Sequence, residues 1–218
     1  MGLDFSVVPS YLDNLFFGAL WTIGITLGAA AISFFGGIGL AVIALYAPAL
    51  IRWPFRVFAF MFMGTPLLLQ LFLIYFGLIQ IGIDLPAFVA GVIGLGLHYA
   101  VYNSDIIQAG ILAVDKGQYE GSRTLGLSQG QTIRKIVVPQ AVRTVIPPIG
   151  NNLIALLKDS ALVSVIGVAE LTLTSQLAIS KTFRPFEFYV AAAGFYYVIN
   201  LGLEAGLRHI ERRIQIAR

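Results

Sequence analysis

Apolar residues in this chain come in long unbroken runs, without the alternation of a half-buried strand or the one-sided stripe of a surface helix. A helix that spans a bilayer needs about 20 mainly apolar residues, and five stretches reach that length. They are residues 14–46, 57–82, 86–114, 143–170 and 188–207. A transmembrane β-barrel would instead show short strands of alternating polarity. The pattern predicts an all-α polytopic membrane protein with five transmembrane helices in one domain, residues 1–218.

Composition supports this class. The chain is 58% hydrophobic and only 11% charged, whereas soluble domains average about 25% charged residues. It contains no cysteine, which excludes a disulfide framework and a thiolate metal site. The start of the chain carries Asp4 and no basic residue, so we expect the first apolar segment to be retained rather than cleaved as a signal peptide.

The distribution of positive charge predicts how the helices are oriented. Lysine and arginine concentrate in the cytoplasmic loops of membrane proteins. With five spans, eleven of the 14 basic residues fall on one side, Lys181 and Arg184 fall on the other, and Lys158 lies within a span. We therefore expect the N-terminus outside and the C-terminus in the cytoplasm. The basic pI of about 9.3 is explained by this topology and gives no reason to infer nucleic-acid binding.

The longest charged segment, residues 115–139, lies on the predicted cytoplasmic side between the third and fourth spans. We expect residues 116–118 to end the third helix, and Gly126 to end a short helix that starts near Tyr119. Ser128 can cap a second short helix, with Gln131 at the position of a capping box. Pro139 is expected to stop that helix. The pattern fits a helix-turn-helix across the cytoplasmic mouth, and it also fits a simple solvated loop.

Motif spacing distinguishes these two interpretations. A Glu-Gly-Ser triplet begins at Glu120, Gly126 follows after three residues, and the segment ends in Ile136-Val-Val138-Pro139. This spacing resembles the EAA loop of ATP-binding-cassette importer permeases, with small residues in place of the two alanines. Further stretches resemble the polar-amino-acid subfamily, which includes histidine, glutamine, arginine and opine permeases. They are Gly64-Thr-Pro-Leu-Leu68, Ala109-Gly-Ile111, Lys116-Gly-Gln118 and Leu156-Leu-Lys-Asp-Ser160.

The resemblance implies a type I importer transmembrane domain with the MetI-like fold, in which residues 115–139 (the coupling segment) form a coupling helix. It implies that this segment docks on a separate ATPase subunit. The implied docking residues are Tyr119, Glu120, Gly121, Ser122, Leu125 and Gly126. It also implies a second permease subunit, either this chain or a paralogue, an extracytoplasmic amino-acid-binding protein, and location in a bacterial inner membrane among lipid.

The chain contains no Walker-type phosphate-binding loop and only two histidines. We therefore expect no cofactor, no metal and no catalysis on this chain, with ATP and magnesium bound by the partner ATPase. Two other functions fit a small polytopic protein. One is a secondary transporter driven by an ion gradient, although such folds usually have more spans. The other is an intramembrane enzyme that modifies lipids, which would need an acid–base cluster at an interface.

Polar side chains within the apolar runs are the candidates for substrate binding, because they are costly in lipid. A zwitterionic amino acid needs partners for its carboxylate and ammonium groups. The residues that we expect to line its site are Gln70, His98, Tyr102, Asn152 and Asp159. The same residues could instead only join helices to one another, and for Asp105 we favour that structural role. Pro147 and Pro148 open the fourth span, where two missing backbone donors are expected either to kink the helix or simply to mark its start.

Overall fold

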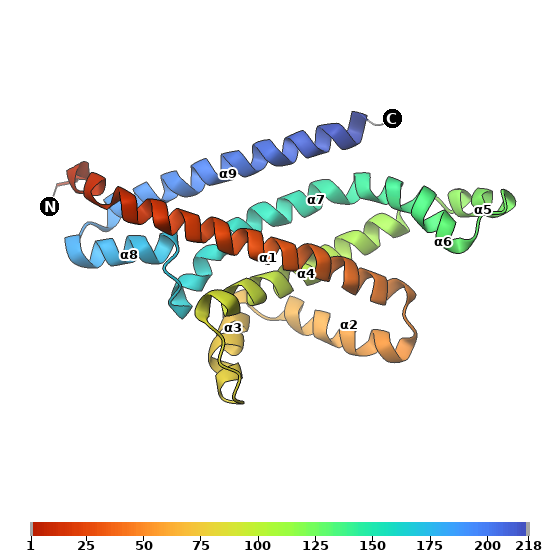
Figure 1. The fold of residues 1–218 in the computed structure, drawn as a ribbon, viewed down its shortest axis with the longest axis horizontal. Helices are drawn as coiled ribbons and strands as arrows, with labels where there is room; N and C mark the ends of the chain where they lie inside the picture. Colours follow the sequence, from red (N-terminus) through yellow and green to blue (C-terminus); the bar gives the residue numbers. More distant parts are fainter. Residues whose placement is uncertain (1, 217–218) are drawn as a thin grey trace.

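The computed structural model describes residues 2–216, and within that range every regular element is a helix. Four long helices run roughly along the long axis of the molecule (Figure 1). They are α1 (Leu12–Tyr46), α4 (Ala87–Leu112), α7 (Val138–Asp159) and α9 (Pro185–Ile216). The shorter elements are η1 (Phe5–Tyr11), α2 (Ala49–Gly64), α3 (Leu67–Phe72), η2 (Leu73–Gly77), α5 (Lys116–Thr124), α6 (Gln129–Thr132), η3 (Ile133–Val137), η4 (Ser160–Ile166) and α8 (Leu171–Thr182).

Four of these helical segments are long and apolar enough to cross a membrane, and a fifth span is obtained when α2 and the helix after it are counted together. The two termini lie at opposite ends of the molecule (Figure 1), as an odd number of spans requires. The coupling segment, the connection from α1 to α2 and the C-terminus share one end, which we call the coupling end. The N-terminus and α8 lie at the opposite end.

The packing of α1 against α4 forms the centre of the bundle, and small residues allow the two backbones to approach closely. A Cβ atom added at Gly96 of α4 would lie 2.6 Å from the Cβ of Ile32 on α1. A Cβ added at Gly37 of α1 would lie 2.8 Å from the Cβ of Asn103. The main hydrophobic core joins these two helices to α3, α7 and η4 around residues such as Leu71 and Leu156.

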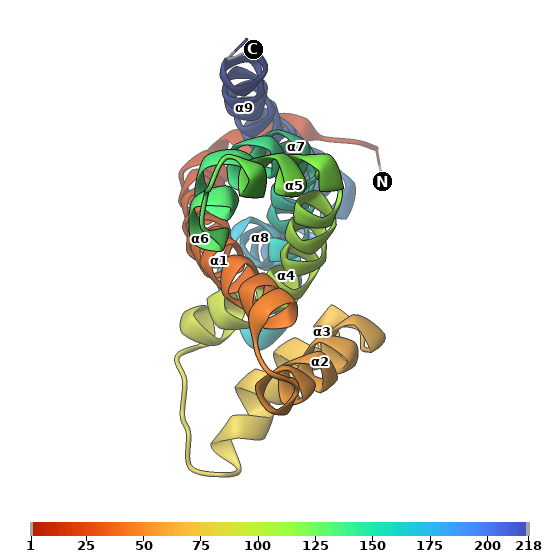
Figure 2. The same ribbon diagram turned by 90° about the vertical axis from the view of Figure 1, so that its right-hand side faces the viewer.

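The second span differs from the single helix that we expected over residues 57–82. Its first helix, α2, begins earlier, at Ala49, and the chain then bends by 116° between Gly64 and Leu67. Pro66 has no backbone N–H and restricts the residue before it to extended backbone, and Thr65 adopts φ −121° and ψ 144°. The break separates α2 from α3, and both project to one side of the bundle, opposite α9 (Figure 2).

The fourth span also differs from its expected bounds of 143–170. Helical backbone runs without interruption from Gln129 to Ile166, through α6, the π-helical turn η3, α7 and η4. Pro139 does not end a helix; it is the second residue of α7, directly after the π-helical turn η3, and such local π adjustments compensate for the missing N–H. Pro147 and Pro148 lie inside α7, because neighbouring helices and local adjustments can satisfy the freed carbonyl groups in a transmembrane bundle.

Candidate functional site

The coupling segment forms a helical hairpin. Its first helix, α5, starts at Lys116 because the side chain of Asp115 caps it by accepting a bond from the N–H of Gly117 at 2.7 Å. Residues 116–118 therefore begin α5 and do not end the third span, as we had expected from the sequence. An aspartate at the N-cap satisfies one of the free N–H groups of a helix start, and this position explains the difference.

The turn after α5 is a Schellman motif. The N–H of Gly126 bonds to the carbonyl of Arg123 and the N–H of Leu127 to the carbonyl of Ser122, each at 3.0 Å. This turn places Gly126 at φ +75°, a conformation that glycine adopts without the steric cost of a Cβ atom. The expected helix end at Gly126 is confirmed.

The second helix of the hairpin begins with the expected capping box. The Oγ of Ser128 accepts from the N–H of Gln131 at 3.4 Å, and Oε1 of Gln131 accepts from the N–H of Ser128 at 2.9 Å. The two helices are then joined by a bond of 2.8 Å between the hydroxyls of Ser122 and Thr132. Ser122 is only 1% exposed, so its role is to hold α5 against α6.

The six expected docking residues therefore divide between two faces. Tyr119 is half-buried and packs against Val114, Val137 and Ala141 at the base of the hairpin, and Ser122 is buried. The other four, Glu120, Gly121, Leu125 and Gly126, are exposed, with Leu125 at 80%. These four residues thus present one charge, two glycines and an exposed apolar side chain at the end of α5 and the turn that follows it.

In the membrane-spanning region, Gln70 and His98 are paired. The Nδ1 of His98 lies 2.9 Å from Oε1 of Gln70, an oxygen that can only accept, so Nδ1 carries the proton and Nε2 is left as an acceptor in the neutral ring. The Nε2 of Gln70 donates to the carbonyl of Phe62 at 2.7 Å and to that of Thr65 at 3.0 Å. Gln70 therefore satisfies backbone groups that the break after α2 leaves without helical partners.

Asp159, the last residue of α7, is held by a residue that we did not select from the sequence. The hydroxyl of Tyr99 donates to Oδ2 of Asp159 at 2.7 Å, and Tyr99 is only 6% exposed. The ring of His98 lies 5.4 Å from that of Tyr99 and 5.0 Å from that of Tyr102. Four of the expected substrate residues (Gln70, His98, Tyr102 and Asp159) thus meet around one aromatic cluster on α4.

The fifth expected substrate residue, Asn152, lies in a different contact. Its Nδ2 donates to Oδ1 of Asn103 at 2.9 Å, and Nδ2 of Asn103 donates to Oγ of Ser33 at 3.3 Å. This chain of three side chains joins α7 to α4 and α1. Asp105 lies apart from the cluster, beside Gln108, in a cavity that it shares with Arg52 and Arg56 near the coupling end.

One buried carboxylate outside the expected site organises the opposite end of the molecule. Glu170 caps α8 by accepting from the N–H groups of Thr172 and Leu173, each at 2.9 Å. It also accepts from the hydroxyl of Tyr196 at 2.8 Å and from Thr22 at 3.4 Å. Glu170 thereby ties α8 to α1 and α9, and its acceptor positions are occupied by structural bonds.

Comparison with known proteins shows one family. Residues 33–216 match the family described as binding-protein-dependent transport system inner membrane component. The chain is 36% identical to the arginine transport system permease protein ArtQ of Bacillus subtilis, over 99% of each chain. It is also 36% identical to the glutamine transport system permease protein GlnP of Escherichia coli K12, over 99% of this chain and 100% of that protein.

Solved structures agree on the fold. The chain superposes with a TM-score of 0.91 on a protein in the crystal structure of an amino acid ABC transporter with histidines, at 38% identity and over 98% of this chain and 100% of that one. A chain of the MetNI methionine ABC transporter superposes with a TM-score of 0.79 over 94% of this chain and 98% of that one. At 18% identity, this second likeness concerns the fold alone.

Proposed function

This chain belongs to the family of binding-protein-dependent transport system inner membrane components, and we propose that its coupling segment transmits the movement of an ATPase subunit to a site for polar amino acids. The chain is a permease subunit of an amino-acid ABC importer, with the all-helical MetI-like fold. The observation that carries the proposal is the hairpin of α5 and α6, joined by the Ser122–Thr132 hydrogen bond, whose outer face exposes Glu120 and Leu125 at the coupling end.

The coupling end is assigned to the cytoplasm on the basis of charge. At this end lie the connection from α1 to α2, the coupling segment and the end of α9 (Figure 1). Arg52 and Arg56 are in the first turns of α2 after that connection, and the other two segments also carry basic residues. At the opposite end, Lys181 is in the last turn of α8 and Arg184 directly precedes α9. Because positive charge marks cytoplasmic loops, the N-terminus is outside and the C-terminus inside. An ATPase subunit, which holds ATP and magnesium, then reaches the hairpin from the cytoplasm.

A second permease subunit, either a copy of this chain or a paralogue, completes the pathway. Helix α2 contains no buried residue. Lipid and a second subunit would together cover its apolar surface within the membrane. At the outer end, the connection at residues 83–86 and the segment around α8 are the surfaces offered to an amino-acid-binding protein. Both lie away from the coupling segment.

The aromatic cluster on α4 is proposed as the substrate site. Asp159 supplies a carboxylate for a cationic group of the substrate. Nε2 of His98 and the hydroxyl of Tyr102, a residue that is 37% exposed, supply hydrogen bonds. Because Tyr99 already fixes one oxygen of Asp159, the carboxylate is held in position before the substrate arrives. Gln70 orients His98, and Asn152 acts on the site only indirectly, by joining α7 to α4 through Asn103.

The test is uptake into liposomes that contain this permease with its ATPase subunit and binding protein. Uptake of a labelled polar amino acid should require ATP on the side of the coupling segment. Uptake that instead follows an imposed proton or sodium gradient without ATP would refute the proposal and favour a secondary transporter.

Docking is tested separately with Glu120→Lys, which reverses a charge on the outer face of the hairpin, and Glu211→Lys, which reverses one on α9 at the same end of the molecule. The ATPase subunit should be lost when the Glu120→Lys permease is purified, and it should remain bound to the Glu211→Lys permease. Equal retention by both variants would place the docking surface elsewhere.

A further inference from the structure

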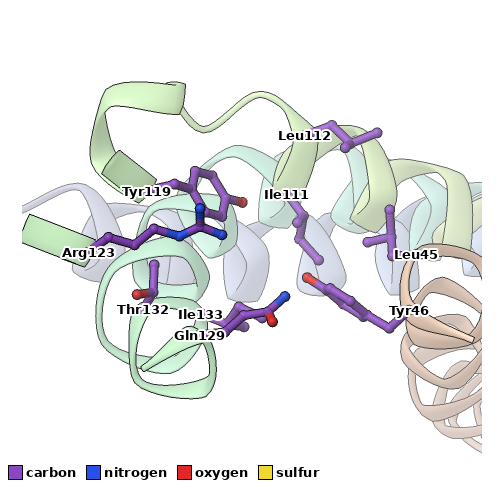
Figure 3. A pocket seen from close by; sticks show the side chains of 9 residues that line it. All are labelled: Leu45, Tyr46, Ile111, Leu112, Tyr119, Arg123, Gln129, Thr132 and Ile133. Atoms are coloured by element: carbon purple, nitrogen blue, oxygen red, sulfur yellow. The ribbon is translucent and has the colours of Figure 1, made fainter. Parts of the chain in front are cut away.

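A cavity of about 210 Å³ lies where the end of α1 meets the coupling segment. Figure 3 shows the guanidinium of Arg123, the hydroxyls of Tyr119 and Tyr46, and the amide of Gln129 pointing into the same space. These groups come from α5, α1 and α6, so the cavity bridges the membrane-spanning bundle and the hairpin.

The polar side of this cavity is suited to an anion. Within residues 2–216, no ion pair or hydrogen bond joins the side chain of Arg123 to another residue, and no carboxylate lines the cavity. Burial raises the pKa of the Tyr119 hydroxyl, and the neighbouring Tyr46 raises it further, so this hydroxyl keeps its proton. Arg123, Tyr119, Tyr46 and Gln129 thus supply hydrogen-bond donors to an anion in this cavity.

A second, larger cavity of about 480 Å³ continues from the first one. The two share Tyr46, Ile111 and Ile133 in their linings. The second cavity runs between α1, α7 and α9 past residues such as Ile146 and Leu207, and its lining is apolar apart from the Tyr46 hydroxyl. Arg212 and Arg213 of α9 follow the lining residue Ile210, together with Glu211, whereas Arg208 is paired with Glu204 at 3.1 Å.

We propose that the two cavities together bind one anionic phospholipid of the cytoplasmic leaflet, with its phosphate at Arg123 and an acyl chain in the apolar cavity between α1, α7 and α9. A molecule with an anionic head and an apolar tail matches both linings and the connection between them. Basic pockets between helices at the cytoplasmic side of a membrane are suited to such head groups. A soluble partner could reach the polar cavity but not the apolar one, which lies alongside membrane-spanning segments.

Binding would connect α1 to the base of the hairpin, because the phosphate contacts both Tyr46 and Arg123. We infer that an anionic lipid stabilises the orientation of the coupling segment and so increases the uptake obtained per ATP hydrolysed. This consequence rests on the proposed function of the hairpin. The binding site itself does not, because it is measured without ATP or transport.

The experiment is native mass spectrometry of the purified permease–ATPase complex, titrated with phosphatidylglycerol or with phosphatidylcholine. Wild-type protein should retain phosphatidylglycerol preferentially. Arg123→Gln should weaken that retention by about fivefold, the effect of one cationic side chain near a membrane surface. Lys135→Gln is the matched control, because Lys135 is an exposed cation of the same segment that lines neither cavity. Equal retention of the two lipids, or unchanged retention by Arg123→Gln, would overturn the site.

A second variant tests the apolar cavity. Ile146→Trp fills space that the acyl chain would occupy and leaves the charges in place, so it should also reduce retention of phosphatidylglycerol. A photo-crosslinking residue at position 129 should capture lipid. Capture of the ATPase or of a second permease copy instead would identify a protein interface and contradict the proposal. Lost lipid binding with unchanged uptake per ATP would overturn only the inference about coupling.

Discussion

At the residue scale, Gln70, His98 and Asp159 are each already engaged with a partner in the membrane-spanning region. Asp159, His98 and Gln70 could be selected from the sequence because each interrupts an apolar run, which is costly unless the residue has a partner or a function. Their partners could not be selected. Tyr99 is an ordinary residue of an apolar helix until α7 brings Asp159 to within 2.7 Å of its hydroxyl.

Asp159→Asn should alter substrate preference more than it alters the fold. The amide oxygen of asparagine can still accept from Tyr99, but the negative charge is lost. Affinity for a cationic amino acid should fall by about tenfold or more, as expected for a hydrogen bond between charged groups, while affinity for a neutral one changes little. Competition uptake with arginine and glutamine measures both, and unchanged affinity for each would remove Asp159 from the site.

Gln70→Leu should destabilise the second span. The variant leaves the carbonyls of Phe62 and Thr65 without the donor that they have at the break, at a cost of about 1–3 kcal/mol. Thermal unfolding of the purified protein in detergent measures the loss. Gln80→Leu, at an exposed position in the turn after η2, is the control and should unfold like the wild type. Equal unfolding temperatures for all three proteins would show that the bend does not depend on Gln70.

At the element scale, the coupling segment was the most predictable part of the molecule. Its capping box and its glycine turn follow from local residue preferences, and both are confirmed. The boundary errors came from residues whose effect depends on context. Asp115 acts as an N-cap instead of leaving residues 116–118 to end the third span, and Pro139 is accommodated in the first turn of α7.

Alanine at two glycines of the hairpin should have opposite effects on its stability. Gly126→Ala forces a Cβ atom into a left-handed conformation and should cost about 1–2 kcal/mol. Gly121→Ala lies within α5 with no atom within 4 Å of the added Cβ, and should stabilise the helix by up to about 1 kcal/mol. Hydrogen exchange of residues 116–132 without the ATPase measures both. Equal protection in the two variants would argue against the Schellman turn.

At the scale of the whole molecule, hydropathy was sufficient to predict a helical membrane protein, and the family and fold are confirmed. What the pattern could not show was the shape of the second span. A hydropathy count cannot distinguish a straight span from one with a 116° bend. The bend is associated with Pro66 and with the hydrogen bonds of the Gln70 side chain, and neither changes the apolar pattern. Likewise, Asn152 contacts Asn103, whereas the other four expected substrate residues meet at the aromatic cluster on α4. This division depends on which helices become neighbours.

The proposed orientation can be tested directly, because the chain has no native cysteine. Single variants Leu125→Cys and Lys181→Cys should react differently with a membrane-impermeant thiol reagent added outside intact cells. Position 181 should be labelled at once, and position 125 only after the membrane is permeabilised. The reverse pattern would invert the topology and place the hairpin beyond the reach of any cytoplasmic ATPase.

The uninterrupted helix from Gln129 to Ile166 has a consequence for efficiency. One end belongs to the hairpin and the other passes Asp159, so continuous helical backbone connects the proposed docking surface with the proposed substrate site. Replacing the exposed residues Gln140 and Thr144 with glycine would add compliance without shifting the helical register. Such a protein should still fold and hydrolyse ATP, yet it should waste nucleotide in futile cycles, because the far end would no longer follow the near one.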